Sequence, residues 1–242
     1  MENERRDINY KILRYVHSGE RVLSIGCGSG KLEEEMQKRG VTVYGVDIDP
    51  DAVRAARGRL SGVSELDIEL CDRLPFPGER FDAVICIDVL EHLRDPSRIL
   101  RMACNRLIPG GRVIVSLPNV ANWSVRLSLL GGRFDYTEHG ILDRTHLRFY
   151  TLKTIGELTA SCGLVITRVD YTTNLLNALY GCLNPRASRT QEARHAGLPA
   201  RRPSWRGRLR RALERMDELL GAAAKGFFAF QFIIVARPRR EL

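Results

Sequence analysis

Seven short apolar or β-branched segments recur along the chain, at spacings typical of strands that alternate with helices. Helical periodicity fills most of the gaps between the first five of them, at 31–39, at 50–59 and from 96 to the turn at 109–111. Strands and helices in this order predict a parallel α/β sheet. The expected strands are 21–26, 41–47, 64–70, 82–87, 112–117, 164–171 and 227–236.

Polar residues mark where the helices begin. Asp-Pro pairs at 49–50 and 95–96 each place a capping side chain before a proline suited to the first helical position. Thr151 is a similar cap for a later helix. Residues 5–18 predict an amphipathic helix that lies on the core, whereas 118–150, rich in Asn, Arg, His and Tyr, are expected to be irregular.

Glycines at positions 26, 28 and 30 separate the first strand from the first core helix. Glycines at such a turn let a ligand approach the backbone, and Asp47 at the end of the next strand can bind a ribose diol. Lys31 stands where a dinucleotide fingerprint has its last glycine, and the acidic residues at 33–35 would repel a pyrophosphate at that helix end. No P-loop motif occurs. The pattern favours a cofactor with a ribose and an adenine but no phosphate, such as S-adenosylmethionine.

Five motifs follow one another in order: VLSIGCGSG (22–30), VYGVDID (43–49), LPFPGERFDAVICIDVLEHLRDP (74–96), IPGGRVIVSLPN (108–119) and DRTHLRFYT (143–151). In this set the chain resembles the class I S-adenosylmethionine-dependent methyltransferases, and most of all their MetW-like and ubiquinone-type O-methyltransferase groups. The resemblance implies a Rossmann-like, seven-stranded sheet, mostly parallel with an antiparallel last strand, and helices on both faces. We expect one domain over 1–242, made of a core at 20–171, the final strand at 227–236 and a basic insertion at 172–226.

The resemblance also implies S-adenosylmethionine as the cofactor. The glycines would admit its methionine moiety, and Asp47 would accept hydrogen bonds from both ribose hydroxyls. Related chains usually carry an acid where this chain has Ser24, and that carboxylate helps to hold the cofactor's amino group, so the uncharged Ser24 could weaken binding. They often place an Asp for the adenine shortly before Leu-Pro-Phe, where Asp72 is the candidate in a shifted register. The expected cofactor-binding residues are Ser24, Gly26, Cys27, Gly28, Gly30, Asp47, Ile48, Asp72 and Asp88.

The segment Asp88-Val-Leu-Glu91-His92 follows the fourth strand, at the edge where ligands bind in open α/β sheets. We expect no metal there. The similar E-x-x-E-H pattern of ubiquinone-type enzymes leaves a divalent cation on Asp88, Glu91 and His92 as the alternative to a polar loop network. His92 and His146 are the candidate catalytic residues, because an imidazole that titrates near neutrality can take the proton of an attacking hydroxyl. The candidate acceptor-binding residues are Asn119, Trp123, Arg144 and Tyr150.

The chain has 242 residues and a formal net charge of +9, which is concentrated in one segment. Residues 186–215 hold ten arginines and two glutamates. Such a segment can bind an anionic membrane surface or an acidic partner, or form a solvated linker. Residues 205–225 predict a basic amphipathic helix that packs on the domain or lies on a membrane. The lack of interleaved aromatic residues argues against a nucleic-acid partner.

The six cysteines show no paired spacing, no apolar run approaches roughly 18 residues, and the N-terminus is charged from its start. We therefore expect a cytoplasmic protein, with peripheral attachment to the inner face of the membrane as an alternative.

The sequence thus predicts a methyltransferase that acts on a small-molecule, glycan or lipid-linked acceptor, with oxygen as the expected acceptor atom. A non-catalytic or partner-dependent binding protein is the alternative from another class, because Ser24 replaces an acid. Methylation of RNA or protein is a further alternative, motivated by the arginine segment. The glycine spacing argues against an NAD-dependent oxidoreductase.

Overall fold

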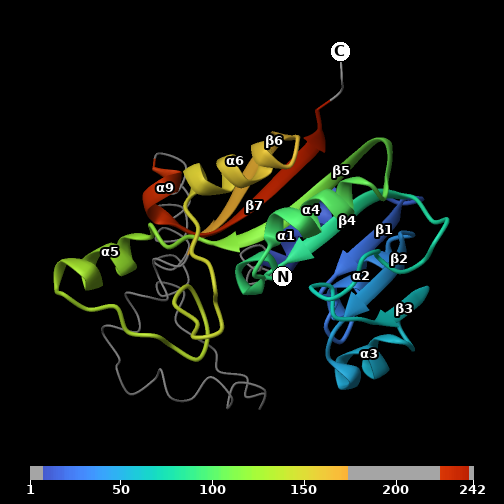
Figure 1. Cartoon of the computed structure of the whole chain (residues 1–242), viewed down its shortest axis with the longest axis horizontal. Coiled ribbons are helices and arrows are strands. Elements are labelled where there is room, and N and C mark those ends of the chain that lie inside the picture. The colour runs from blue at the N-terminus through green and yellow to red at the C-terminus, as the bar shows by residue number, and fades with distance from the viewer. Residues whose placement is uncertain (1–7, 174–223, 240–242) are drawn as a thin grey trace, which may run out of the picture.

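The computed structural model describes residues 8–173 and 224–239, which form a seven-stranded sheet in the order β3-β2-β1-β4-β5-β7-β6. Figure 1 shows these strands side by side, from β3 at one end to β6 at the other. All pairings are parallel except those of β7, which runs antiparallel to both of its neighbours. This confirms the expected fold class. The strands are β1 Arg21–Ile25, β2 Thr42–Asp47, β3 Gly62–Glu65, β4 Phe81–Ile87, β5 Leu107–Pro118, β6 Leu164–Thr173 and β7 Ala229–Pro238.

The helices begin where the capping residues indicated. Asp49 accepts a hydrogen bond from the amide of Asp51, and Asp95 accepts one from the amide of Arg98. Thr151 forms a capping box with Thr154. The α-helices are α1 Ile8–Ile12, α2 Lys31–Lys38, α3 Pro50–Ala56, α4 Pro96–Cys104, α5 Trp123–Leu130, α6 Leu152–Ser161 and α9 Lys225–Phe228, and the 3-10 helices are η2 Leu13–Tyr15 and η3 Leu90–His92.

Helices cover both faces of the sheet. Alternate residues of a strand point to opposite sides, so one strand contributes to a buried cluster on each face. Leu23 of β1 packs in one fully buried cluster with Leu100 of α4 and Ile155 of α6. Its neighbour Val22 packs in the other, with Met36 of α2. None of the described helices is both long and apolar enough to cross a bilayer.

Several element boundaries differ from the expectations. The third strand ends at Glu65, because a turn begins there in which Asp67 accepts a hydrogen bond from the amide of Glu69. The fifth strand extends back to Leu107, with the expected glycine turn becoming an irregularity in its pairing with β4. The last strand begins at Ala229, after the short helix α9.

Two further expectations concern helices. Helix α5 lies inside the segment expected to be irregular, where Asn122 caps it and Val125 is buried. The N-terminal helix ends earlier than expected, in the 3-10 turn η2, and positions 5–7 of the expected helix lie outside the described residues. The arginine segment at 186–215 and most of the expected helix at 205–225 lie outside the described residues, so the insertion and the single-domain boundaries stay predictions.

Candidate functional site

The predicted site lies at one edge of the sheet. β1 pairs in parallel with β2 and with β4, so the carboxyl ends of these three strands meet. Gly26 follows β1, Asp47 ends β2 and Asp88 follows β4. Loops at this edge are where open α/β sheets bind their ligands.

The glycine loop has a backbone that only glycine adopts without strain. Gly26, Gly28 and Gly30 have φ values of +74°, +52° and +75°. A Cβ at Gly26 would collide with Cγ2 of Val89, whereas a Cβ at Gly28 would have nothing within 4 Å. The loop is therefore packed at its base and open at its centre, where a ligand can reach the backbone.

Asp47 shapes this loop as well as facing it. Its Oδ2 accepts a hydrogen bond from the amide of Gly28 at 2.6 Å, and its Oδ1 accepts one from the amide of Asp49 at 3.0 Å. Each carboxylate oxygen can accept a second hydrogen bond, so Asp47 keeps acceptor capacity for a ribose diol. Next to it, the side chain of Ile48 is 62% exposed and Asp72 lies exposed on the loop after β3.

Ser24 has a charged neighbour that the sequence analysis did not identify. Its hydroxyl is buried and donates a hydrogen bond at 2.7 Å to Oε1 of Glu33, in the first turn of α2. Burial raises the pKa of the Glu33 carboxyl, and the hydrogen bond from Ser24 opposes part of this shift. The run of acids at 33–35 was the only signal in the sequence, and it suited a helix start equally well.

Cys27 is a buried packing residue. Burial, reinforced by the charges of Glu33 and Asp47, raises the pKa of its thiol to about 12. The side chain packs with Ala56 and Leu60. It therefore stays a neutral thiol beside the loop.

Asp88 is held in an unusual conformation after β4. It has a positive φ of 53°, which is uncommon for a residue other than glycine. The hydroxyl of Ser116 donates to its Oδ1 at 2.5 Å, and the amide of the Gln231 side chain donates to the same oxygen. Burial raises the pKa of the Asp88 carboxyl, while these hydrogen bonds oppose the shift. Asp88 thus connects β4, β5 and β7 at the site edge.

The two candidate catalytic histidines lie against each other, with ring centroids 4.8 Å apart. Nδ1 of His146 lies 3.1 Å from the carbonyl of Ile141, and Nδ1 of His92 lies 3.2 Å from the carbonyl of Thr145. A carbonyl oxygen only accepts, so Nδ1 of His146 carries the hydrogen and its Nε2 keeps a lone pair when the ring is neutral. Nδ1 of His92 also lies 3.2 Å from the hydroxyl of Thr145, which can donate or accept, so these contacts fix the tautomer of His146 and not that of His92. Burial lowers the pKa of His146, which favours that neutral form.

Glu91 completes this cluster. Its backbone carbonyl accepts hydrogen bonds from the amides of Leu147 and Arg148, which brings His146 to His92. In the part of the chain that the structure describes, its buried Oε2 has no hydrogen-bond partner, and neither has the buried hydroxyl of Tyr150. Burial and the charge of Asp88 raise the pKa of the Glu91 carboxyl to about 8. One ligand-type atom from each of Glu91, His92 and His146 lies within 4.8 Å of the others, and Asp88 is not in this group.

The four candidate acceptor residues occupy different environments. Asn119 is fully buried, and its side-chain amide donates to the carbonyl of Ala229 at 2.8 Å, so it holds β7 in place. Tyr150 is buried, Trp123 is half-buried at the start of α5, and Arg144 is exposed and paired with Glu138 at 2.5 Å. The structure does not bring these four side chains into one group.

An aromatic cluster beside His146 escaped the sequence analysis. Phe149 lies 6.2 Å from the His146 ring and 5.6 Å from Phe134, and Phe134 lies 5.6 Å from Tyr136, measured between centroids. Phe134 and Tyr136 remain 38% and 54% exposed. The cluster places aromatic surface next to the histidine pair.

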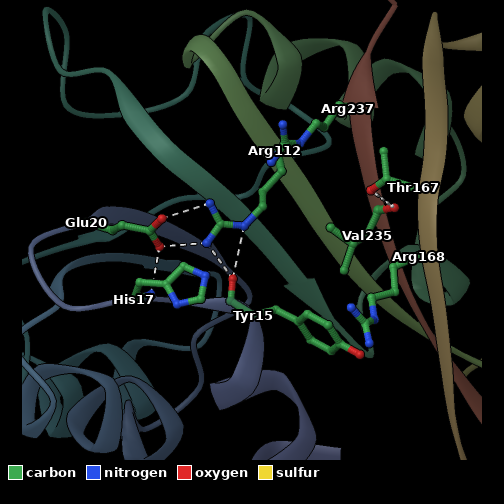
Figure 2. A pocket seen from close by; sticks show the side chains of 8 residues that line it. All are labelled: Tyr15, His17, Glu20, Arg112, Thr167, Arg168, Val235 and Arg237. Atoms are coloured by element: carbon green, nitrogen blue, oxygen red, sulfur yellow. Dashed lines mark hydrogen bonds and ion pairs between the residues drawn. The ribbon is translucent and has the colours of Figure 1, made fainter.

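A separate pocket of about 370 Å³ lies at the amino ends of the parallel strands, away from this edge. In Figure 2 the guanidinium of Arg112 points toward Glu20 and the carbonyl of Tyr15. It donates to the two carboxylate oxygens of Glu20 at 2.9 and 2.6 Å. These contacts hold the segment before β1 against β5. The pocket is lined by Tyr15, His17, Glu20, Arg112, Thr167, Arg168, Val235 and Arg237.

Known proteins with a similar sequence indicate the family of this chain. A family model described as a methyltransferase domain matches residues 2–169. Ubiquinone biosynthesis O-methyltransferase of Pseudomonas entomophila (strain L48) is 37% identical over 138 residues, which cover 52% of this chain and 56% of that protein. The match thus spans about half the length of this curated relative.

Two solved structures are similar in fold. A SAM-dependent methyltransferase from Archaeoglobus fulgidus gives a TM-score of 0.59 at 19% identity, over 95% of this chain and 92% of that one. Magnesium protoporphyrin IX methyltransferase from Synechocystis PCC 6803, with bound SAH, gives 0.55 at 21% identity, over 71% and 78%. At sequence identities this low, the likeness shows a shared fold and nothing about the reaction.

Proposed function

Because this chain belongs to the methyltransferase domain family, we propose that it transfers a methyl group from S-adenosylmethionine to a hydroxyl oxygen of a small-molecule acceptor. The observation that carries the proposal is the meeting of two features at one sheet edge. The open glycine loop with Asp47 provides a cofactor site, and the His92–His146 pair provides proton acceptors.

The residues at the loop fit the cofactor. Asp47 has acceptor capacity for two ribose hydroxyls, Gly28 leaves its backbone accessible, and the exposed Ile48 offers apolar surface for an adenine. When bound, S-adenosylmethionine supplies a methyl group on a positively charged sulfur. The protein's part is to hold it in line with the acceptor and to exclude water.

His146 is the proposed proton acceptor. Its Nδ1–H is committed to the carbonyl of Ile141, so Nε2 is free to take the proton of the acceptor hydroxyl. The lowered pKa keeps the ring neutral and ready for this role. His92 supports the position of the ring through their edge contact.

The aromatic cluster supports an acceptor with an aromatic or apolar portion. Phe149, Phe134 and Tyr136 provide ring faces and edges beside His146. A relative named ubiquinone biosynthesis O-methyltransferase agrees with a phenolic hydroxyl as the acceptor group. A phenol ionises more readily than an aliphatic alcohol, which suits an imidazole base.

The experiment is methyl transfer from labelled S-adenosylmethionine to a panel of acceptors: catechol-type phenols with and without an isoprenoid tail, and a monosaccharide. We expect methylation of the phenols, and a fall in kcat of about 10²–10⁴-fold in His146→Gln. His139→Gln is the matched control, because the His139 side chain lies in the same segment and is 95% exposed. Wild-type kcat in His146→Gln would refute the assigned base. Binding of S-adenosylmethionine without turnover on any acceptor would favour the non-catalytic or partner-dependent alternative.

A divalent cation is the second candidate for activating the acceptor. It is favoured by the close approach of Glu91, His92 and His146 and by the unpartnered Oε2 of Glu91. Such a cation would polarise the acceptor hydroxyl directly. Activity that survives EDTA supports the histidine base, whereas activity lost in EDTA and restored by Mg²⁺ or Zn²⁺ supports the cation.

The arginine segment at 186–215 is proposed to attach the protein peripherally to anionic membranes. At low salt the protein should co-sediment with phosphatidylglycerol vesicles and stay in the supernatant with phosphatidylcholine vesicles. Equal co-sedimentation with both lipids would contradict this proposal.

A further inference from the structure

Among the residues that the structure describes, Glu33 is a buried carboxylate without a counter-charge. Only 3% of the residue is exposed, and its one side-chain partner among the described residues is the hydroxyl of Ser24, itself 1% exposed. The next two acids of the same helix differ from it. Glu34 lies 3.4 Å from the ammonium of Lys38 and Glu35 lies 2.7 Å from it, and both are exposed or half-exposed.

Burying a carboxylate in this way lowers the stability of the folded protein, which is unfavourable for a residue with only a structural role. A buried carboxylate that lacks a cation loses its hydration, and a single hydroxyl replaces only part of it. The first turn of α2 supplies a favourable helix dipole, which again offsets only part of the cost. A neutral side chain of similar volume would serve packing better, so the charge points to a ligand.

The position of Glu33 identifies which ligand group it can meet. Glu33 lies in the first turn of α2, directly after the N-cap Gly30 of the glycine loop, and Asp47 accepts the amide of Gly28 in the same loop. The two carboxylates therefore lie near the same loop, and Glu33 is joined to the end of β1 through Ser24. Asp47 is bonded to the open centre of the loop at Gly28, where a ribose fits. The cofactor has two cationic groups, the sulfonium that carries the methyl and the α-ammonium of its methionine portion, and only the ammonium can donate hydrogen bonds to a carboxylate.

We propose that Glu33 binds the α-ammonium group of S-adenosylmethionine, from the first turn of α2, with Ser24 holding its carboxylate in position. The negative charge that related chains usually carry at position 24 is then supplied from another element, by a carboxylate oxygen 2.7 Å from the Ser24 hydroxyl. The site keeps its charge complementarity, and Ser24 does not by itself make the chain non-catalytic. This inference rests on the proposed use of the cofactor but is independent of the acceptor.

Two ligands separate the ammonium contact from the rest of the site. S-adenosylhomocysteine carries the ammonium, while 5′-methylthioadenosine keeps the adenine, ribose and sulfur and lacks the amino-acid group. Calorimetric titration of the full chain with each ligand therefore measures the contribution of Glu33 without requiring an acceptor. The variants are Glu33→Gln, the matched control Glu35→Gln, and the double variant Ser24→Asp/Glu33→Gln.

We expect Glu33→Gln to raise the Kd of S-adenosylhomocysteine by about tenfold or more and to leave that of 5′-methylthioadenosine unchanged. Its Tm without ligand should stay the same or rise, because a buried charge has been removed. Glu35→Gln should bind both ligands like the wild type. The double variant should recover part of the lost affinity, because it returns a carboxylate to the same place.

Wild-type affinity of Glu33→Gln for S-adenosylhomocysteine would overturn the assignment while leaving the proposed function intact. So would an equal loss for both ligands, since that result indicates a distorted loop. If the wild-type protein binds neither ligand, the proposed cofactor site and this assignment both fail.

Discussion

Replacing Glu91 by Gln tests the electrostatics of the sheet edge that carries the histidine pair. Its Oε2 is buried without a partner in the part of the chain that the structure describes. Burial, and to a smaller extent the charge of Asp88, raises the pKa of the Glu91 carboxyl from 4.5 to about 8. Glutamine has nearly the same shape but no charge at any pH. The variant therefore isolates the cost of ionising this one group in the folded protein.

The sign of the effect follows from the direction of the shift. Below about pH 4.5 the carboxyl is protonated in both the folded and the unfolded chain, so its contribution to stability is fully present. Between about pH 4.5 and 8 the unfolded chain releases the proton and the folded chain keeps it. The free energy of unfolding then falls by about 1.4 kcal/mol per pH unit. The loss is complete above about pH 8 and amounts to about 5 kcal/mol in all.

Urea unfolding of the wild type and Glu91→Gln at several pH values between 5 and 8 measures this difference. We expect the variant to gain stability relative to the wild type steadily as the pH rises. A lost or strained contact of the new amide would shift the whole difference by a constant, without changing its slope. Glu157→Gln, on the exposed face of α6, is the control and should give a flat difference. A flat difference for Glu91→Gln as well would refute the reasoning.

Three further predictions concern the loop and its support. Asp47→Ala should raise the Kd of S-adenosylhomocysteine by about tenfold or more in calorimetry, whereas Asp51→Ala, an exposed acid of α3, should leave it unchanged. Asn119→Ala should cost about 1–3 kcal/mol in urea unfolding, because it removes the donor to the carbonyl of Ala229 and the acceptor of the Ala121 amide, while the side chain of Asn122 keeps its own bond to Ala229. Loss of activity at unchanged stability would instead make Asn119 an acceptor residue. Gly26→Ala should lower Tm by several degrees, because of its positive φ and its collision with Val89, and adding Val89→Ala should recover only the part due to the collision.

The sequence predicted the features that are repeated or local. Apolar periodicity located the strands of the sheet, and the capping residues Asp49, Asp95 and Thr151 located three helix starts. Parallel strand order then placed the glycine loop and Asp47 at one edge, because all carboxyl ends of a parallel sheet meet there. These inferences need only the chain's own order.

Contacts between distant segments were outside the reach of that reasoning. Asn119 looked like an acceptor residue in a polar segment, but its amide is committed to the carbonyl of Ala229, more than a hundred residues further along. Helix α5 begins with the cap of Asn122 and buries little, so periodicity gave no sign of it. The partnership of Ser24 with Glu33 depends on how α2 packs against β1, which no spacing rule encodes.

Four carboxyl groups at the sheet edge that carries the glycine loop and the histidine pair, those of Asp47, Asp88, Glu33 and Glu91, differ in what surrounds them. The two oxygens of Asp47 accept backbone amides, and Asp88 accepts the hydroxyl of Ser116 and the amide of Gln231. Glu33 has one hydroxyl, and Glu91 has an oxygen without a partner in the described chain. Since buried polar groups in folded proteins are generally satisfied, the first pair is explained by the fold and the second pair is not. The two acids that the fold leaves incompletely matched lie beside the glycine loop and the histidine pair, which is where the proposed function places a cationic cofactor and its acceptor.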